Sequence, residues 1–152
     1  MNLKISYFNN IRNFNKYDIP LSTAMWDPKW YTQHIDKNEV INGLKCSPLV
    51  FSHKEYSQLK NECQRHCQQV PFHCEFMRKY REHLNKIDFV SLMMWFESVI
   101  EKIAELNNDL KNKDKYQIVL IVHEKPEIHC AERPILQEWF KDNNIVLEEY
   151  CL

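Results

Sequence analysis

Short apolar runs alternate with helical patterns along this chain. Residues 118–122 (Ile-Val-Leu-Ile-Val) are the most apolar run and predict a strand buried on both faces. Residues 3–8 alternate weakly before two asparagines, and residues 19–24 are short and β-branched, so both predict strands. A further strand is expected over residues 145–150. Strands interleaved with helical patterns are typical of an α/β protein.

Three later segments have the three-and-four spacing of amphipathic helices. A four-residue apolar repeat predicts a helix over residues 76–85. Asp88 is a typical N-cap residue and would begin a longer helix that reaches about residue 110. The apolar residues along that helix are Phe89, Leu92, Met93, Phe96, Ile100, Ile103 and Leu106. A last helix is expected over residues 132–142.

These elements predict one domain with a Rossmann-like fold, in which helices flank a small, mostly parallel sheet. The length of 152 residues suits a single domain. From about residue 26 to 75 no hydrophobic period persists, which predicts an irregular, cysteine-rich insertion. Gly43 is the only glycine, so neither a glycine-rich dinucleotide loop nor a P-loop can form. A bound phosphate would then depend on helix N-termini and basic side chains.

The net charge and the hydropathy of the chain indicate which classes of partner and which cellular location to expect. The net charge of −1 does not favour a protein that binds nucleic acid through its phosphates, although a local basic patch could still do so. No run approaches the roughly 18 apolar residues of a membrane span, and the N-terminal segment lacks the apolar core of a secretory signal. We therefore expect a soluble, cytoplasmic protein with no membrane partner.

Four cysteines in or near the insertion form a candidate metal site. They are Cys46, Cys63, Cys67 and Cys74, with His66 and His73 between them. Zinc prefers four thiolate or imidazole ligands, and the spacing of Cys63 and Cys67 would place two sulfurs on one helical face. The cluster therefore predicts zinc. Separate reduced thiols, or an iron–sulfur cluster on the same cysteines, are the alternatives.

A polar loop after the most apolar strand gathers residues with versatile chemistry. They are Glu124, Lys125, His129, Cys130, Glu132 and Arg133. Ligands of open α/β sheets bind beyond the carboxyl ends of the strands, so this loop predicts a site. Cys130 could act as a nucleophile, because a helix N-terminus and Arg133 would favour its thiolate, with His123 or His129 as base. The alternatives are ligand binding without covalent chemistry and simple packing of the cysteine.

A third cluster follows the first two strands. It consists of Ser6, Arg12, Trp26, Asp27, Lys29 and Trp30. In a parallel sheet Arg12 and Arg133 would line one cleft and bind a carboxylate or phosphate through bidentate hydrogen bonds. The two tryptophans offer flat surfaces for a stacked base, although tryptophans more often pack in or around a core.

The same stretches resemble a known family. Residues 5–8 with Ile11 and Arg12, residues 19–22 with Trp26 and Trp30, and residues 124–126 (Glu-Lys-Pro) before Cys130 and Arg133 are similar to domain-of-unknown-function family number 488. The signature of that family at this place is Cys-His-Arg. Here Ala131 and Glu132 separate the cysteine from the arginine, and the histidine has no counterpart. The resemblance spans most of the chain and implies a site at the cysteine and arginine, without an established reaction.

Two classes of function fit these patterns. The first is an enzyme that acts on a nucleotide or nucleic-acid base, with Arg12 and Arg133 binding the anion and Glu124 or Glu132 as acid or base. The second is a non-catalytic binding or inhibitor module that holds a signalling nucleotide or a protein partner at the same cleft. Both classes use the cleft at the carboxyl edge of the sheet, and a nucleotide-like or nucleic-acid-derived anion is the expected ligand there.

Overall fold

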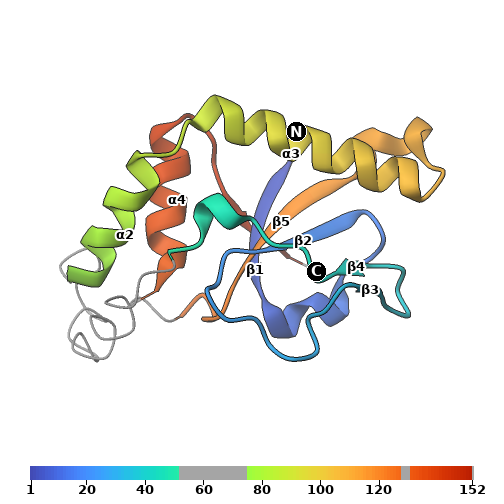
Figure 1. The fold of residues 1–152 in the computed structure, drawn as a ribbon, viewed down its shortest axis with the longest axis horizontal. Coiled ribbons are helices and arrows are strands. Elements are labelled where there is room, and N and C mark those ends of the chain that lie inside the picture. The colour runs from blue at the N-terminus through green and yellow to red at the C-terminus, as the bar shows by residue number, and fades with distance from the viewer. Residues whose placement is uncertain (52–74, 128–130, 152) are drawn as a thin grey trace.

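A four-stranded parallel sheet lies at the centre of the molecule, with the strand order β2-β5-β1-β6. Figure 1 shows β2, β5 and β1 of this sheet. The computed structural model describes residues 1–51, 75–127 and 131–151. The strands are β1 (Leu3–Tyr7), β2 (Asp18–Ser22), β3 (His34–Ile35), β4 (Ile41–Asn42), β5 (Gln117–Val122) and β6 (Glu148–Glu149). Of these, β3 and β4 form a separate antiparallel pair. The small α/β sheet predicted from the sequence is confirmed.

The strand β5 occupies the interior of the sheet, between β2 and β1. Its register with β1 runs from Leu3 opposite Ile118 to Tyr7 opposite Val122. Residues 118–122 are all buried, because neighbouring strands cover both edges and other segments cover both faces. This burial explains why the run is continuously apolar and does not alternate.

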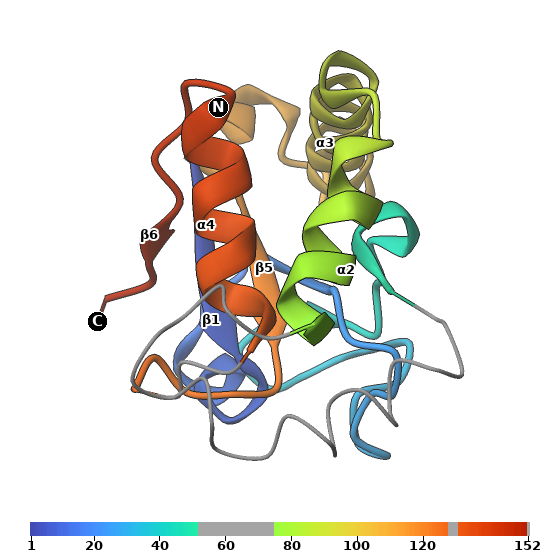
Figure 2. The ribbon, with the colours of Figure 1, turned by 90° about the vertical axis from the view of Figure 1, so that its left-hand side faces the viewer.

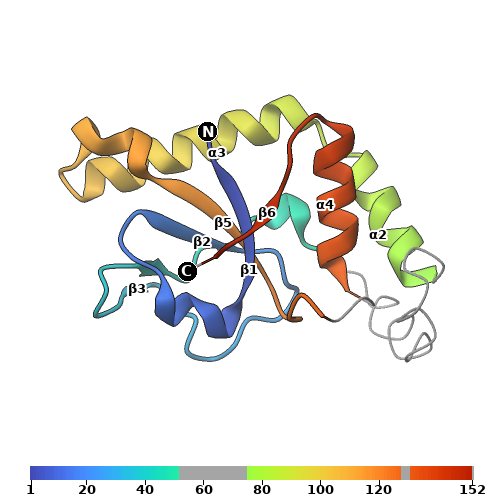
Figure 3. The ribbon, with the colours of Figure 1, turned by 180° about the vertical axis from the view of Figure 1, so that it is seen from behind.

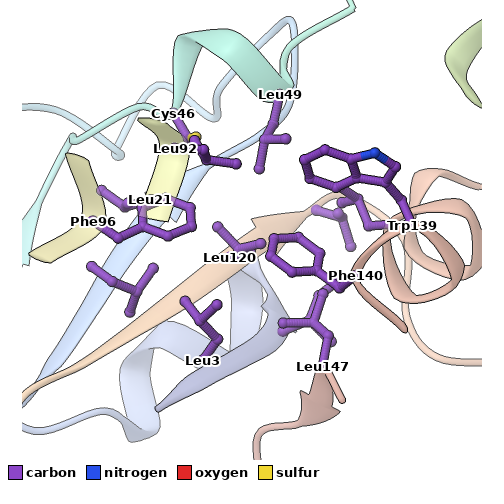
Figure 4. Packing of buried hydrophobic residues seen from close by; sticks show 14 of the residues in the cluster. Leu3, Leu21, Cys46, Leu49, Leu92, Phe96, Leu120, Trp139, Phe140 and Leu147 are labelled. Atoms are coloured by element: carbon purple, nitrogen blue, oxygen red, sulfur yellow. The ribbon is translucent and has the colours of Figure 1, made fainter. Parts of the chain in front are cut away.

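Three α-helices pack on one face of the sheet: α2 (Glu75–Asn85), α3 (Phe89–Leu106) and α4 (Glu132–Asp142). Figure 2 shows α2 and α4 side by side, and α3 beyond α2. Leu120 of β5 packs among Phe96 of α3 and Phe140 of α4 (Figure 4). In the described part of the chain, no helix has the length and apolar character needed to cross a membrane.

The helix α3 begins where its sequence predicts. The Asp88 carboxylate accepts hydrogen bonds from the backbone N–H groups of Val90 (3.2 Å) and Ser91 (3.4 Å), as an N-cap does. The helix ends at Leu106, before the expected position, and the 3-10 helix η4 (Leu110–Lys115) follows. Asn108 in the intervening turn has a positive φ of 53°, which a continuing right-handed helix does not permit.

The other face of the sheet has no α-helix among the described residues. It is covered by the 3-10 helix η1 (Phe8–Asn13) and by part of residues 23–44, which contribute buried side chains next to Val119 and Ile121 of β5. A further 3-10 helix, η2 (Ser47–Leu49), continues the chain. Residues 26–51 of the expected insertion therefore form β3, β4, η2 and loops, whereas residues 52–74 lie outside the described residues.

The chain leaves the neighbouring strands β1 and β5 toward opposite faces. After β1 it enters η1, whose buried residues belong to the cluster on one face, and after β5 it enters α4 on the other face. Figure 3 shows β6 alongside β1, at the edge of the sheet to which α4 leads. The carboxyl ends of β1 and β5 are therefore the topological switch point, where ligands of open α/β sheets bind.

Candidate functional site: a groove between η1 and the β3–β4 pair

A groove of about 530 Å³ lies beyond the carboxyl end of β1, between η1 and the β3–β4 pair. Its described lining residues are Phe8, Asn9, Ile11, Arg12, Trp30, His34, Asp36, Lys37, Asn38 and Asn42. Arg12 and Trp30, which the sequence pattern had placed in one cluster, thus lie in one groove. His34 and Lys37 join them, although no pattern in the sequence singled out these two residues.

Trp30 gives the groove an aromatic wall. Its ring meets the buried ring of Phe8 nearly edge-on, with centroids 6.3 Å apart, and the ring of Tyr31 at 6.1 Å. These contacts hold the indole, yet Trp30 keeps 46% of its surface exposed. An aromatic side chain that is held by its neighbours and still exposed is suited to stacking against a flat ligand.

The charged residues make the groove cationic. Arg12 and Lys37 are both exposed and carry two positive charges, and Asp36 is the one acidic residue among the described lining residues. Asp36 accepts hydrogen bonds from Asn38 N (2.8 Å), Val40 N (3.1 Å) and Asn42 Nδ2 (3.2 Å). These hydrogen bonds stabilise the turn between β3 and β4. With two positive charges and one negative charge, the described lining residues have a formal net charge of +1.

One hydrogen bond joins the β3–β4 pair to η1, and a close backbone approach holds the two flanks of the pair together. Asn38 Nδ2 donates to the Arg12 carbonyl oxygen at 3.1 Å, which joins the turn to η1. Gly43 follows β4 with φ of 89°, and a Cβ atom there would lie 2.4 Å from the backbone carbon of Thr32. The backbone at this position therefore requires glycine, both for its φ and for the close approach.

The serines at the strand ends are buried. Ser6 Oγ in β1 accepts from Asn10 Nδ2 at 2.9 Å, and Ser22 Oγ at the end of β2 donates to the Asp27 carboxylate. Asp27 in turn pairs with Lys45 at 3.5 Å. This network was not predicted, although a serine at a strand end five residues before an aspartate is its sequence signal. Both serines hold the loops at the carboxyl edge and do not line the groove.

Trp26 and His123 meet at the same edge. Trp26 is 71% exposed, and its carbonyl oxygen accepts a hydrogen bond from His123 Nε2. A carbonyl oxygen can only accept, so His123 Nε2 carries the proton in this contact. The His123 ring also packs 4.9 Å from the Phe8 ring. His123 therefore connects the end of β5 to the aromatic wall of the groove.

Arg133 lies inside the protein, 3% exposed, and not among the lining residues of the groove. Its Nε is 2.5 Å from a carboxylate oxygen of Glu149, and its Nη1 donates to the Glu124 carbonyl oxygen. Burial raises the pKa of the Glu149 carboxyl, and the positive charge of Arg133 partly offsets this shift. The structure thus brings Arg12, but not Arg133, to the groove, contrary to the shared cleft expected from the sequence.

The other predicted site residues in and after the loop that follows β5 differ in their exposure to solvent. Lys125 is exposed, Glu124 is partly exposed and Glu132 is buried in the first turn of α4. His129 and Cys130 lie outside the described residues, so the predicted nucleophile stays a prediction. The described N-cap of α4, Ala131, makes no side-chain capping hydrogen bond.

The predicted zinc ligands are only partly described. Cys46 is fully buried in the apolar core beside Leu49, and burial raises the pKa of its thiol to about 12. Cys63, Cys67 and Cys74 lie outside the described residues. In the described ranges no three His, Cys, Asp or Glu side chains come together as a metal ion would require. The zinc site therefore remains a prediction.

A second hollow, of about 620 Å³, lies at the opposite, amino end of the strands between α3 and η4. It is larger than the groove, but Glu97, Glu101 and Asp114 line it with a single described basic residue, Lys113. Three acidic side chains against one basic side chain disfavour an anionic ligand. The smaller groove is therefore the better candidate for such a ligand.

No protein-family model matches the chain, and no curated protein or solved structure is found to be similar to it. The resemblance to domain-of-unknown-function family number 488 thus remains a prediction from residues 5–133. The geometry of the groove is the evidence on which a function can be proposed.

Proposed function

We propose that this protein binds a nucleotide-like anionic ligand in the groove between η1 and the β3–β4 pair. The observation that supports this most strongly is that exposed Trp30, Arg12 and Lys37 line the same groove. Stacking of a base on an aromatic side chain contributes about 1–3 kcal/mol. Arginine binds phosphate through two parallel hydrogen bonds, and the groove lies at the edge of the sheet where such ligands bind.

The residues of the groove support a binding function without catalysis better than an enzymatic one. Its described lining residues include no serine or cysteine that could act as a nucleophile. A binding or inhibitor module for a signalling nucleotide therefore needs no residue beyond those of the groove. An enzyme that forms a covalent intermediate would need a nucleophile from elsewhere in the chain, and Cys130 is the residue that the sequence suggests for it. Loss of turnover, with unchanged ligand affinity, in a Cys130→Ser variant would support that second form.

Calorimetric titration with adenosine and guanosine monophosphates tests the binding directly. Arg12→Gln should weaken binding by about tenfold or more, because a hydrogen bond to a charged group contributes about 1.5–3 kcal/mol. Trp30→Ala should weaken it by about fivefold or more through lost stacking. Arg78→Gln is the matched control, since Arg78 is an exposed arginine of α2 paired with Glu75 and Glu82.

Two results would contradict the proposal. One is the absence of binding of either nucleotide by the unmodified protein at millimolar concentration. The other is equal affinity of the Arg12→Gln and Arg78→Gln variants, which would place the ligand somewhere other than the groove. The unfolding temperature of each variant should be measured first, so that a folding defect is not mistaken for a binding defect.

A further inference from the structure

One ring nitrogen of His34 is fixed by the backbone and the other is left for a ligand. Nδ1 of His34 lies 2.6 Å from the Thr32 carbonyl oxygen, and the Thr32 hydroxyl is 3.4 Å from the same nitrogen. Because a carbonyl oxygen only accepts, Nδ1 must carry a hydrogen. Within the described chain Nε2 makes no hydrogen bond, and His34 is an exposed lining residue of the groove.

The backbone around His34 holds the ring in place. His34 pairs with Asn42 across the β3–β4 ladder, and the Asn42 amide donates to Asp36 in the connecting turn. Asn38 of the same turn is bonded to Arg12 in η1. His34 therefore belongs to a strand pair that hydrogen bonds hold in place. Such preorganisation lowers the entropy lost when a ligand binds.

The charges of the groove depend on the protonation state of this ring. The other charged side chains among its described lining residues are Arg12, Lys37 and Asp36, which sum to +1. A protonated His34 raises the sum to +2 and turns Nε2 into a hydrogen-bond donor. A phosphomonoester carries a charge of about −1.5 to −2 at neutral pH, whereas a phosphodiester carries one negative charge. The groove with protonated His34 thus matches a monoester.

We infer that the ligand carries a terminal phosphomonoester group and that His34 binds it through Nε2, together with Arg12 and Lys37. This rests on the proposed function, since it specifies the class of nucleotide that the groove accepts. His34 thereby distinguishes a nucleoside monophosphate from the corresponding nucleoside or cyclic diester. Among the described residues that line the groove, His34 is the one histidine, the residue type whose charge ordinarily changes between pH 5 and 8.

Titration of the full chain with adenosine, adenosine 5′-monophosphate and the 3′,5′-cyclic monophosphate at pH 6 and pH 8 tests this inference. At pH 6 the unmodified protein should bind the monoester about tenfold more tightly than the cyclic diester, as one charge-assisted hydrogen bond provides. His34→Gln keeps a side-chain donor but cannot become charged. It should lose most of that preference, and its affinity should depend on pH only through the ligand's own titration, which both proteins share.

The outcomes separate the inference from the proposed function. If the unmodified protein and His34→Gln show the same ratio of affinities at the two pH values, the role of His34 is excluded. Equal binding of the monoester and the cyclic diester, both weakened by Arg12→Gln, would overturn the inference and leave the proposed function intact. Failure of the unmodified protein to bind any of the three ligands would overturn both. Circular dichroism should confirm that each variant is folded.

Discussion

Gly43 is a position next to the groove at which the backbone itself requires glycine. Its positive φ and its approach to Thr32 bring the end of β4 against the chain that leads into β3. From the sequence, a single glycine excluded a glycine-rich phosphate loop. The structural role of Gly43 was not predictable, because it brings two segments into contact that are not neighbours in the sequence.

Replacement of Gly43 by alanine should destabilise the protein. A non-glycine residue in this region of φ costs about 1–3 kcal/mol, and overlap of Cβ with the backbone adds about 1–3 kcal/mol. We expect the free energy of unfolding, from urea denaturation, to fall by about 2–6 kcal/mol. Asn108→Gly, at another position of positive φ, is the control and should change it by less than about 1 kcal/mol. Equal stability of the two variants would show that the turn tolerates a side chain.

Individual residues of the candidate site were predictable only where they follow a strand that the hydrophobic pattern itself predicts. Arg12 and Trp30 were identified because they come after the first two strands. His34 and Lys37 were missed because β3 and β4 have two residues each, too few for a hydrophobic period. Arg133 was expected beside Arg12, and it is instead buried against Glu149, a pairing brought about by β6 and not visible in the sequence near α4.

Among the secondary-structure elements, the start of α3 was predictable and its end was not. The N-cap depends on the residue type of Asp88 and on the apolar period after it, both of which are local. The end depends on the turn at Asn107 and Asn108, where a positive φ stops the helix although Leu110 continues the apolar pattern. Likewise β6 is shorter than the apolar run suggested, because only Glu148 and Glu149 pair with β1.

The cap of α3 makes stability depend on pH. Hydrogen bonds from Ser91 lower the pKa of the Asp88 carboxyl in the folded protein. A lowered folded pKa means that the stabilisation is present above the ordinary aspartate pKa of about 3.9 and is lost as the pH falls through the folded value. Asp88→Ala should therefore lower the unfolding temperature by a few degrees at pH 7 and have little effect near pH 2.

A matched variant on the same helix separates the cap from a general loss of charge. Glu97 is an exposed residue of α3, far from its first turn, and Glu97→Ala removes the same charge. Thermal unfolding of this variant should show no comparable loss at pH 7. An equal loss in both variants would mean that net charge, and not the cap, explains the effect.

At the scale of the whole molecule, the sequence predicted the layers but not their arrangement. The helical periods indicated amphipathic helices next to a parallel sheet, and the structure has them. All three described α-helices lie on one face, while η1 and part of residues 23–44 cover the other. Which face a helix covers depends on the path of each crossover connection, and no period in the sequence reports that path.

The cysteine cluster gives a prediction about the composition of the whole protein. If Cys46, Cys63, Cys67 and Cys74 bind zinc, elemental analysis of protein purified without added metal should find about one zinc per chain. Burial raises the pKa of the Cys46 thiol to about 12, so a metal ion would have to displace its proton. Cys46→Ser should then lose the metal, whereas Cys151→Ser, at an exposed cysteine, should keep it. Absence of metal from the unmodified protein would leave the alternative of separate thiols.

The position of the groove along the chain has an evolutionary consequence. Every described residue that lines it lies between Phe8 and Asn42, whereas α2, α3 and α4 pack on the far face of the sheet. Substitutions that exchange one ligand for another are therefore concentrated in a short stretch that contributes little to the helical layer. Selection could alter recognition in that stretch while the larger core keeps the protein folded, so related chains should diverge in ligand sooner than in architecture.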